Sequence, residues 1–322
     1  MPKVSVIIPV YGVEKYIERC ARSLFGQTLD DVEYLFIDDC SPDKSIEILK
    51  NVLEEYPNRK QQVVIHRMDQ NSGQAAVRKW GMLNATGEYI IHCDSDDWVE
   101  TDMYELMYNE AKRIDADMVF CGYRTTDGVN VLREYYHTHT DKDEILRSML
   151  TMAESWSTWT KICKKSLYMN NIIYPQYAMG EDMVLILQLV LRSNRFGIVN
   201  KVLYNYYSNP TSITKTRTAD TQFRHRVEAT KNVEVVLSAF ESYGLTDKYS
   251  HELFILKFQQ KRQAIHLAVH KKYSKAWLSI FPELDSKVWQ LDGISAKEKL
   301  KYYIALVVAQ FNTHCYGSPN ND

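Results

Sequence analysis

The sequence predicts an α/β fold built on a mostly parallel sheet flanked by helices, followed by a helical carboxyl-terminal region. Short apolar runs alternate with segments of helical period through the first third of the chain, which is typical of parallel strands joined by crossover helices. From about Asp220 the pattern changes to long helical segments with few glycines. We therefore expect a sheet domain over residues 1–217 and a helical extension over residues 218–322.

Five apolar runs are expected to form strands of the sheet. They cover residues 4–10, 33–38, 62–66, 88–93 and 117–122. Between the first two, the apolar side chains from Val13 to Leu24 recur at helical spacing, which predicts an amphipathic helix. The first run is short and contains Pro9, so we interpret it as a strand and not as a signal peptide. Ligands of such sheets bind beyond the carboxyl ends of the strands, so the residues after each run are the informative ones.

Composition narrows the classes of partner and compartment. The 322 residues are 45% hydrophobic, and 39 Lys and Arg against 41 Asp and Glu give a net charge of -2, which does not favour nucleic acid. The six cysteines are scattered without CxxC spacing, as is usual in a reducing cytosol. No run reaches the roughly 18 apolar residues of a membrane-spanning helix. We expect a cytoplasmic protein, with attachment to the inner face of the cell membrane left open.

Three carboxylates, Asp94, Asp96 and Asp97, follow the fourth run within four positions. Two such charges ~4 Å apart repel by about 4 kcal/mol near a protein surface. The pattern therefore indicates either a nearby cation or an ordinary solvated turn, and the two are about equally frequent for an isolated acidic stretch. The second run is followed by Asp39 in the stretch DDCSPDKS, where a turn with Ser41 or Asp43 capping the next helix is the alternative.

Another pair of acids, Glu181 and Asp182, follows Gly180 and precedes a long apolar helical run. Acids in the first turn of a helix are common because they interact favourably with the helix dipole. A carboxylate can also act as a general base. The spacing alone favours the first interpretation.

The motifs together resemble those of the inverting glycosyltransferases of family 2, which have the GT-A fold. The resemblance covers roughly residues 3 to 215 and rests on VSVIIPVYG, YLFIDDCSPDKS, NSGQAAVRKWGMLNATGEYIIHCDSDDWV, WSTWTKICKKSLY and GEDMVL, in the family's order. It implies an enzyme that moves a sugar from a nucleotide-diphosphate sugar to a glycan or lipid-linked acceptor in surface polysaccharide synthesis. The alternatives are an inactive sugar-nucleotide-binding subunit and a sugar-nucleotide nucleotidyltransferase, although the latter needs a glycine-rich basic loop that PVYGVEKYI does not provide.

The resemblance assigns the donor site to residues at the strand ends. Asp94-Ser95-Asp96 resembles the family's DxD motif, which implies Mn²⁺ or Mg²⁺ held by Asp96 directly, with Asp94 toward the ribose or the metal's waters. Asp97 is either a cap of the helix beginning near Thr101 or a catalytic residue. The other donor-binding positions are Asp39 against the base, which favours uracil, Pro9 and Tyr11 beside it, and Arg78 near the base and diphosphate.

The same resemblance makes Asp182 the catalytic base, with Glu181 as its acceptor-binding neighbour. It implies a single displacement that inverts the anomeric centre. Trp159 and Lys161 are candidates for acceptor or phosphate contacts, with core packing as the alternative. Residues 204–215 resemble the family's closing strand and loop, where Ser212 would reach phosphate, but a plain aromatic edge strand is the preferred interpretation.

The last helical segment joins Lys297, Lys299 and Lys301 to an apolar run. We expect it to pack in a core or in a homodimer, with contact at an anionic membrane surface as the second interpretation. The pair His266 and His270 has the spacing of a zinc helix but lacks the associated glutamate, so we interpret it as an ordinary helical pair. A solvated loop is expected around residues 137–139.

Overall fold

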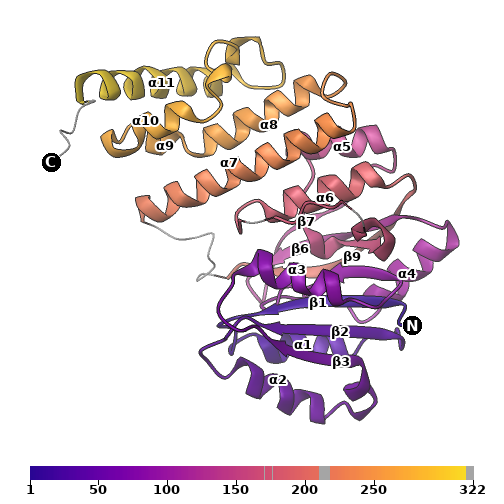
Figure 1. The fold of residues 1–322 in the computed structure, drawn as a ribbon. Helices are drawn as coiled ribbons and strands as arrows, with labels where there is room; N and C mark the ends of the chain where they lie inside the picture. The colour runs from indigo at the N-terminus through magenta and orange to yellow at the C-terminus, as the bar shows by residue number, and fades with distance from the viewer. Residues whose placement is uncertain (170, 176, 210–217, 317–322) are drawn as a thin grey trace. The chain divides into compact units, whose positions relative to one another are not determined.

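The computed structural model describes residues 1–322 except 170, 176, 210–217 and 317–322, and it shows a nine-stranded mixed sheet with helices (Figure 1). The strands are β1 (Val4–Val10), β2 (Val32–Asp38), β3 (Val63–Arg67), β4 (Tyr89–His92), β5 (Trp98–Val99), β6 (Met118–Thr126), β7 (Val131–Tyr135), β8 (Lys161–Lys164) and β9 (Phe196–Tyr207). Their order is β3-β2-β1-β4-β8-β6-β9-β5, with β7 paired to β6. The five predicted strands are confirmed as β1, β2, β3, β4 and β6.

The helices follow the strands in the predicted alternation. They are α1 (Ile17–Phe25), α2 (Ser45–Glu54), α3 (Gln74–Asn84), α4 (Met103–Arg113), α5 (Lys142–Leu150), α6 (Glu181–Arg192), α7 (Ala219–Ser242), α8 (Ser250–Gln263), α9 (Ile265–Ala268), α10 (Lys271–Ser279) and α11 (Ala296–Tyr316). The helix predicted from Val13 to Leu24 is present as α1, and the helical carboxyl-terminal region is confirmed as α7 to α11.

Two details of the sheet differ from the prediction. Strands β1 to β4 are parallel, but β8 lies antiparallel between β4 and β6, so the fifth predicted strand does not pair with the fourth. The expected aromatic edge strand is wrong as well, because β9 pairs with both β6 and β5. Strand β8 was missed because four residues are too few for a recognisable strand pattern. The pairing of β9 was missed because its partners lie far away in the sequence.

The sheet buries side chains on both faces. Val4, Val6 and Ile8 of β1 lie in the same core as apolar residues of α1 and α4. On the other face, Ile7 meets α3 at Gly81, where an added Cβ would lie 2.5 Å from the isoleucine side chain. Only glycine allows that approach, so this close packing fixes α3 against β1. The sheet is thus covered on both sides, as parallel strands require.

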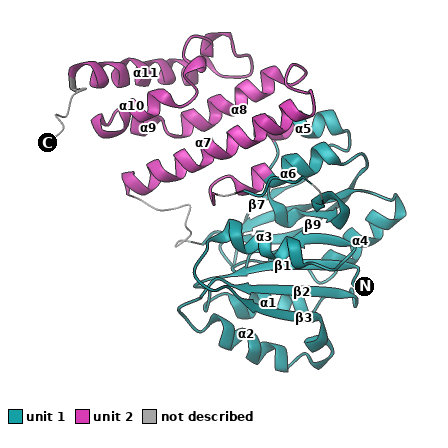
Figure 2. Ribbon diagram, viewed as in Figure 1, with its two compact units in different colours: residues 1–146, 154–176, 185–211 teal, residues 147–153, 177–184, 212–322 magenta. Residues whose placement is uncertain are grey.

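The chain forms two compact units (Figure 2). Unit 1 comprises residues 1–146, 154–176 and 185–211 and contains the sheet. Unit 2 comprises residues 147–153, 177–184 and 212–322 and contains α7 to α11. The boundary between the units passes through α6, whose first turn belongs to unit 2.

Candidate functional site

The aspartate cluster lies in the short loop between β4 and β5, beyond the carboxyl end of β4. The Asp97 amide donates to the carbonyl oxygen of Asp94 at 3.1 Å, which closes a tight turn around Ser95 and Asp96. The turn therefore brings the Asp94, Asp96 and Asp97 carboxylates close together, as the sequence predicted.

Asp97 is fully buried and ties the loop to β9. Its carboxylate accepts a hydrogen bond from the Tyr204 hydroxyl at 2.7 Å and another from the Tyr207 amide at 2.7 Å. The Tyr204 hydroxyl in turn accepts from the Asp94 amide at 3.1 Å. The suggestion that Asp97 caps the next helix is wrong, because α4 begins at Met103 and the Asp97 side chain points to β9 instead.

Two arginines supply fixed positive charge to the loop. Arg78 of α3 is 1% exposed and donates from Nη2 to Asp94 Oδ1 at 2.6 Å. Arg19 of α1 donates from Nη2 to the Asp96 carbonyl oxygen at 2.9 Å, and its guanidinium lies 3.7 Å from the ring centroid of Trp98. Tyr207 stacks against the same guanidinium at 4.9 Å, so the loop is surrounded by cationic and aromatic groups.

Two carboxyl groups of the loop still resist ionisation. Burial raises the pKa of Asp96, and the neighbouring Asp94 charge raises it further. Burial also raises the pKa of Asp97, with Asp96 and Asp94 adding to the effect. Repulsion between neighbouring carboxylates raises their pKa values whenever nearby cations do not fully offset the negative charge. An additional cation bound at Asp96 would stabilise its ionised form.

The donor set fits a hard divalent cation. Asp94 Oδ1 accepts hydrogen bonds from the Arg78 guanidinium and, at 3.5 Å, from the Gln74 side chain. Asp96 Oδ2 accepts from the Asn209 side-chain Nδ2 at 3.0 Å. No group of three His, Cys, Asp or Glu side chains with metal-binding geometry occurs in the described ranges. Two carboxylates alone suit Mg²⁺ or Mn²⁺, which keep several waters and bind substrate phosphates. Asp96 and Asp94 are therefore the residues that would hold the metal.

Asp39 lies at the end of β2 and organises the start of α3. Its Oδ1 accepts from the Ser72 amide at 2.7 Å and its Oδ2 accepts from the Gly73 amide at 2.9 Å. The carboxylate is 5% exposed. It therefore holds the loop before α3, and any contact with a base would use its remaining lone pairs. Tyr11, at the carboxyl end of β1 just after Pro9 and Val10, is 49% exposed, as a side chain that stacks on a ligand requires.

The predicted base and its neighbour open α6, in unit 2. Glu181 is 2% exposed, while Asp182 is partly exposed. Gly180 precedes them with φ +79, and the Asn232 side chain donates to the carbonyl oxygens of Tyr177 at 3.1 Å and Met179 at 2.7 Å. These bonds from α7 fix the loop that leads into the helix.

The weaker candidates lie mostly in the interior. Trp159 is 7% exposed and stacks on Tyr204 with ring centroids 4.2 Å apart. Lys161 is 1% exposed, and its ammonium donates to the carbonyl oxygens of Ser155 at 3.0 Å and Ser157 at 2.8 Å. In this structure both side chains pack in the core. Ser212 falls outside the described residues.

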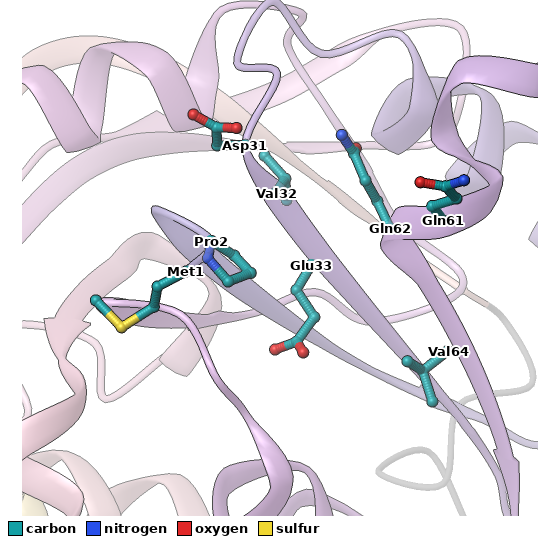
Figure 3. A pocket seen from close by; sticks show the side chains of 8 residues that line it. All are labelled: Met1, Pro2, Asp31, Val32, Glu33, Gln61, Gln62 and Val64. Atoms are coloured by element: carbon teal, nitrogen blue, oxygen red, sulfur yellow. The ribbon is translucent and has the colours of Figure 1, made fainter.

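A hollow elsewhere in unit 1 is unrelated to this site. It has a volume of about 290 Å³ and lies at the amino ends of β1, β2 and β3, opposite the ends that carry the aspartates (Figure 3). Its lining residues are Met1, Pro2, Asp31, Val32, Glu33, Gln61, Gln62 and Val64. The site described above is therefore identified by its chemistry and by its place at the strand ends.

The sequence did not point to Arg19, and it marked Tyr204 and Asn209 only as members of the segment 204–215, without a role of their own. Each contacts the aspartate loop from a segment at least 75 positions away in the chain, and no local pattern marks such contacts. The tyrosine-rich stretch YNYYSN, residues 204–209, was the available signal, because a buried tyrosine hydroxyl usually has a partner.

Comparison with known proteins finds relatives that are named as glycosyltransferases. EpsJ of Bacillus subtilis (strain 168), an uncharacterized glycosyltransferase, is 28% identical over 79% of this chain and 74% of its own length. The cholesterol galactosyltransferase of Borreliella burgdorferi is 31% identical over 64% of this chain and 60% of its own. Among solved structures, S. aureus TarS 1–349 in complex with UDP-GlcNAc matches with a TM-score of 0.61 and 20% identity, over 99% of this chain and 93% of that one.

The TarS likeness shows the GT-A glycosyltransferase fold. The model of the family described as Glycosyl transferase family 2 matches residues 5–176, which include Asp39, Arg78 and the whole aspartate loop. The match covers more than half of the chain. Together with the strand-end carboxylates, it shows that the chain belongs to glycosyl transferase family 2 and is a transferase enzyme.

Proposed function

We propose that the enzyme transfers a sugar from a nucleotide-diphosphate sugar, a UDP-sugar, to a hydroxyl of a glycan or lipid-linked acceptor in surface polysaccharide synthesis. The observation that carries this proposal is the loop from Asp94 to Asp97, where two carboxylates suited to a divalent cation lie at the carboxyl end of β4. The TarS complex with UDP-GlcNAc supports a uridine nucleotide.

The proposed chemistry is one displacement with inversion. The acceptor oxygen forms a bond to the anomeric carbon, the bond from that carbon to the diphosphate breaks, and the acceptor proton passes to the Asp182 carboxylate. Asp96 and Asp94 would hold Mn²⁺ or Mg²⁺, which when bound would supply Lewis-acid stabilisation of the leaving diphosphate. Arg78 orients the Asp94 carboxylate through the 2.6 Å hydrogen bond. Asp39 holds the loop before α3 in the position from which it would contact the nucleotide base of the donor.

A thermal-shift titration tests the donor site. The purified protein is mixed with UDP, GDP, TDP or CDP, each with and without Mn²⁺, and the melting temperature is measured. We expect a manganese-dependent rise with UDP. Asp96→Asn is expected to abolish the manganese-dependent part, while Asp292→Asn, which changes an exposed carboxylate in unit 2, retains it. Equal melting temperatures under all eight conditions would overturn the proposal.

A further inference from the structure

Helix α11 exposes a continuous apolar stripe. Leu300 is 54% exposed, Ile304 57%, Val307 60% and Phe311 61%. Their spacing of four, three and four residues places all four side chains on one side of the helix. Single exposed apolar residues are ordinary on a protein surface, but four aligned on three turns of one helix are not.

The opposite side of α11 is firmly packed in unit 2. Tyr302 and Ala309 are fully buried, and Tyr302 lies 5.5 Å from Trp277 between ring centroids. The Tyr302 hydroxyl also donates to the Asp285 carboxylate, which accepts from Lys261 at 2.8 Å. The helix is therefore anchored in a defined orientation, and the exposed stripe is a fixed surface.

Positive charge surrounds the amino-terminal end of the stripe. Lys297 and Lys301 are exposed, and Lys299 donates to the carbonyl oxygen of Trp289 at 3.0 Å. Glu298 is the one acidic residue in the sequence of α11, and it pairs with Arg262 at 3.0 Å, an arginine of α8 on the packed side. The exposed side thus combines apolar and cationic residues without a carboxylate in its sequence.

An aromatic pair extends this surface. Trp289 is 51% exposed and stacks on Tyr303 of α11 with ring centroids 5.4 Å apart. Tryptophan and tyrosine favour the boundary between water and lipid, because each has a large apolar ring and a polar group.

We propose that this face of α11, defined by Leu300, Ile304, Val307 and Phe311 with Lys297 and Lys301, docks on an anionic lipid bilayer. A helix of this kind lies in the plane of the interface, with its apolar side chains at the boundary of headgroups and acyl chains. Lysines near an anionic surface add attraction that salt weakens. Within the described residues, no helix combines the length and the apolar character that a membrane span needs.

Charge decides between a bilayer and a second copy of the chain. A second copy presents the same lysines, so pairing two such faces gains no attraction from them. An anionic bilayer offers opposite charge at the headgroups and an apolar layer beneath them, which matches both parts of the face. This proposal goes beyond sugar transfer and does not depend on it.

The test is vesicle flotation with the whole chain. Vesicles of phosphatidylcholine with 30% phosphatidylglycerol are compared with pure phosphatidylcholine, at low salt and in 0.5 M NaCl. We expect binding to the anionic vesicles that falls at high salt, and at least about tenfold weaker binding to the neutral ones. The proposal would be overturned if the protein bound neither the anionic nor the neutral vesicles.

Matched variants locate the contact. Ile304→Ser with Phe311→Ser is expected to reduce binding at least about tenfold, whereas Leu83→Ser with Leu132→Ser, which are 60% and 56% exposed in unit 1, retains it. Lys297→Glu with Lys301→Glu is expected to have a similar effect, with Lys44→Glu and Lys50→Glu as the charge control on exposed lysines of unit 1.

Two further measurements separate the outcomes. Each variant should retain the parental circular dichroism spectrum and melting temperature, and the parental shift with UDP and Mn²⁺, so loss of lipid binding is not loss of folding or of the donor site. Sedimentation velocity reports self-association. The proposal would be overturned if the α11 variants bound anionic vesicles as tightly as the parent does. It would also be overturned if the parent did not bind vesicles but formed a dimer that the α11 substitutions dissociate.

Discussion

The Tyr204 hydroxyl donates to Asp97 Oδ2 at 2.7 Å, and both side chains are fully buried. The same hydroxyl accepts from the Asp94 amide at 3.1 Å. One oxygen atom of β9 therefore connects the first and last aspartates of the loop. The position of the expected metal ligands depends on a residue more than 100 positions away in the chain.

Tyr204→Phe is expected to loosen the aspartate loop. The change leaves the Asp97 carboxylate with one hydrogen bond fewer and the Asp94 amide without its acceptor, which costs about 1–3 kcal/mol of the free energy of unfolding. We also expect a lower affinity for Mn²⁺ with UDP, because the carboxylates are no longer held in one arrangement. Urea denaturation measures the first effect, and calorimetric titration of Mn²⁺ in the presence of UDP measures the second.

Tyr104→Phe is the matched control. Tyr104 is also fully buried, but in the described part of the chain its hydroxyl has no hydrogen-bond partner. Removal of that hydroxyl should leave Mn²⁺ affinity unchanged. Equal effects of the two variants on Mn²⁺ affinity would show that Tyr204 does not position the loop.

The parts of the fold that the sequence predicts are those with a strong local pattern. The apolar runs of β1, β2 and β4 and the helical spacing of α1 each lie within one short segment, and all are present. The position of β8 between β4 and β6 depends on pairings at long separation, which the four residues Lys161–Lys164 do not reveal. Local patterns determine elements, but tertiary packing determines their order in the sheet.

The candidate site divides in the same way. Asp94 and Asp96 are visible as candidates because three carboxylates follow a predicted strand within four positions, and the resemblance to the family motif favours a cation over a solvated turn. The burial of Arg78 and Lys161 is not evident, because an isolated Arg or Lys in a sequence is normally exposed. The partner of Arg78 is Asp94, on the loop after β4. The partners of Lys161 are close in the sequence, but they are the backbone carbonyl oxygens of Ser155 and Ser157, which no side-chain pattern marks.

Asp39→Asn is expected to release the loop before α3. Each carboxylate oxygen accepts from a backbone amide, Ser72 or Gly73, and an asparagine would place an NH₂ donor against one of these donors. We expect a loss of about 1–3 kcal/mol in the free energy of unfolding and faster hydrogen exchange at Ser72 and Gly73. Asp69→Asn, at an exposed position nearby, is the control. Unchanged hydrogen exchange at Ser72 and Gly73 in Asp39→Asn would show that the Asp39 carboxylate does not hold this loop.

Asp182→Asn is expected to reduce sugar transfer by about 10²–10⁴ in kcat, because the amide cannot accept the acceptor proton. The shift in melting temperature with UDP and Mn²⁺ should remain, since the change leaves the carboxylates of the aspartate loop in place. Glu47→Gln removes a first-turn acid from α2 and controls for the effect of the helix dipole. Transfer at the parental rate in Asp182→Asn would refute its role as the base.

The last prediction concerns the stability of unit 1 in acid. His137, expected in a solvated loop, is 6% exposed instead, with Nε2 3.4 Å from the Thr160 hydroxyl. Burial lowers the pKa of His137 to about 4, and the Lys161 charge adds to this effect, against the opposing influence of Glu154. In the unfolded chain a histidine has a pKa near 6.5, so the unfolded state binds the proton first as pH falls. The stabilising contribution is present above about pH 6.5 and is lost as pH falls toward 4.

Between pH 7 and pH 5 this one group should remove about 2 kcal/mol from the free energy of unfolding. Urea denaturation at the two pH values measures the loss, and His137→Gln should show a loss smaller by that amount because its side chain takes up no proton. His139→Gln removes a half-buried imidazole from the same segment and is the comparison variant. An equal pH dependence in His137→Gln and the parent would mean that the buried imidazole is not the group that titrates.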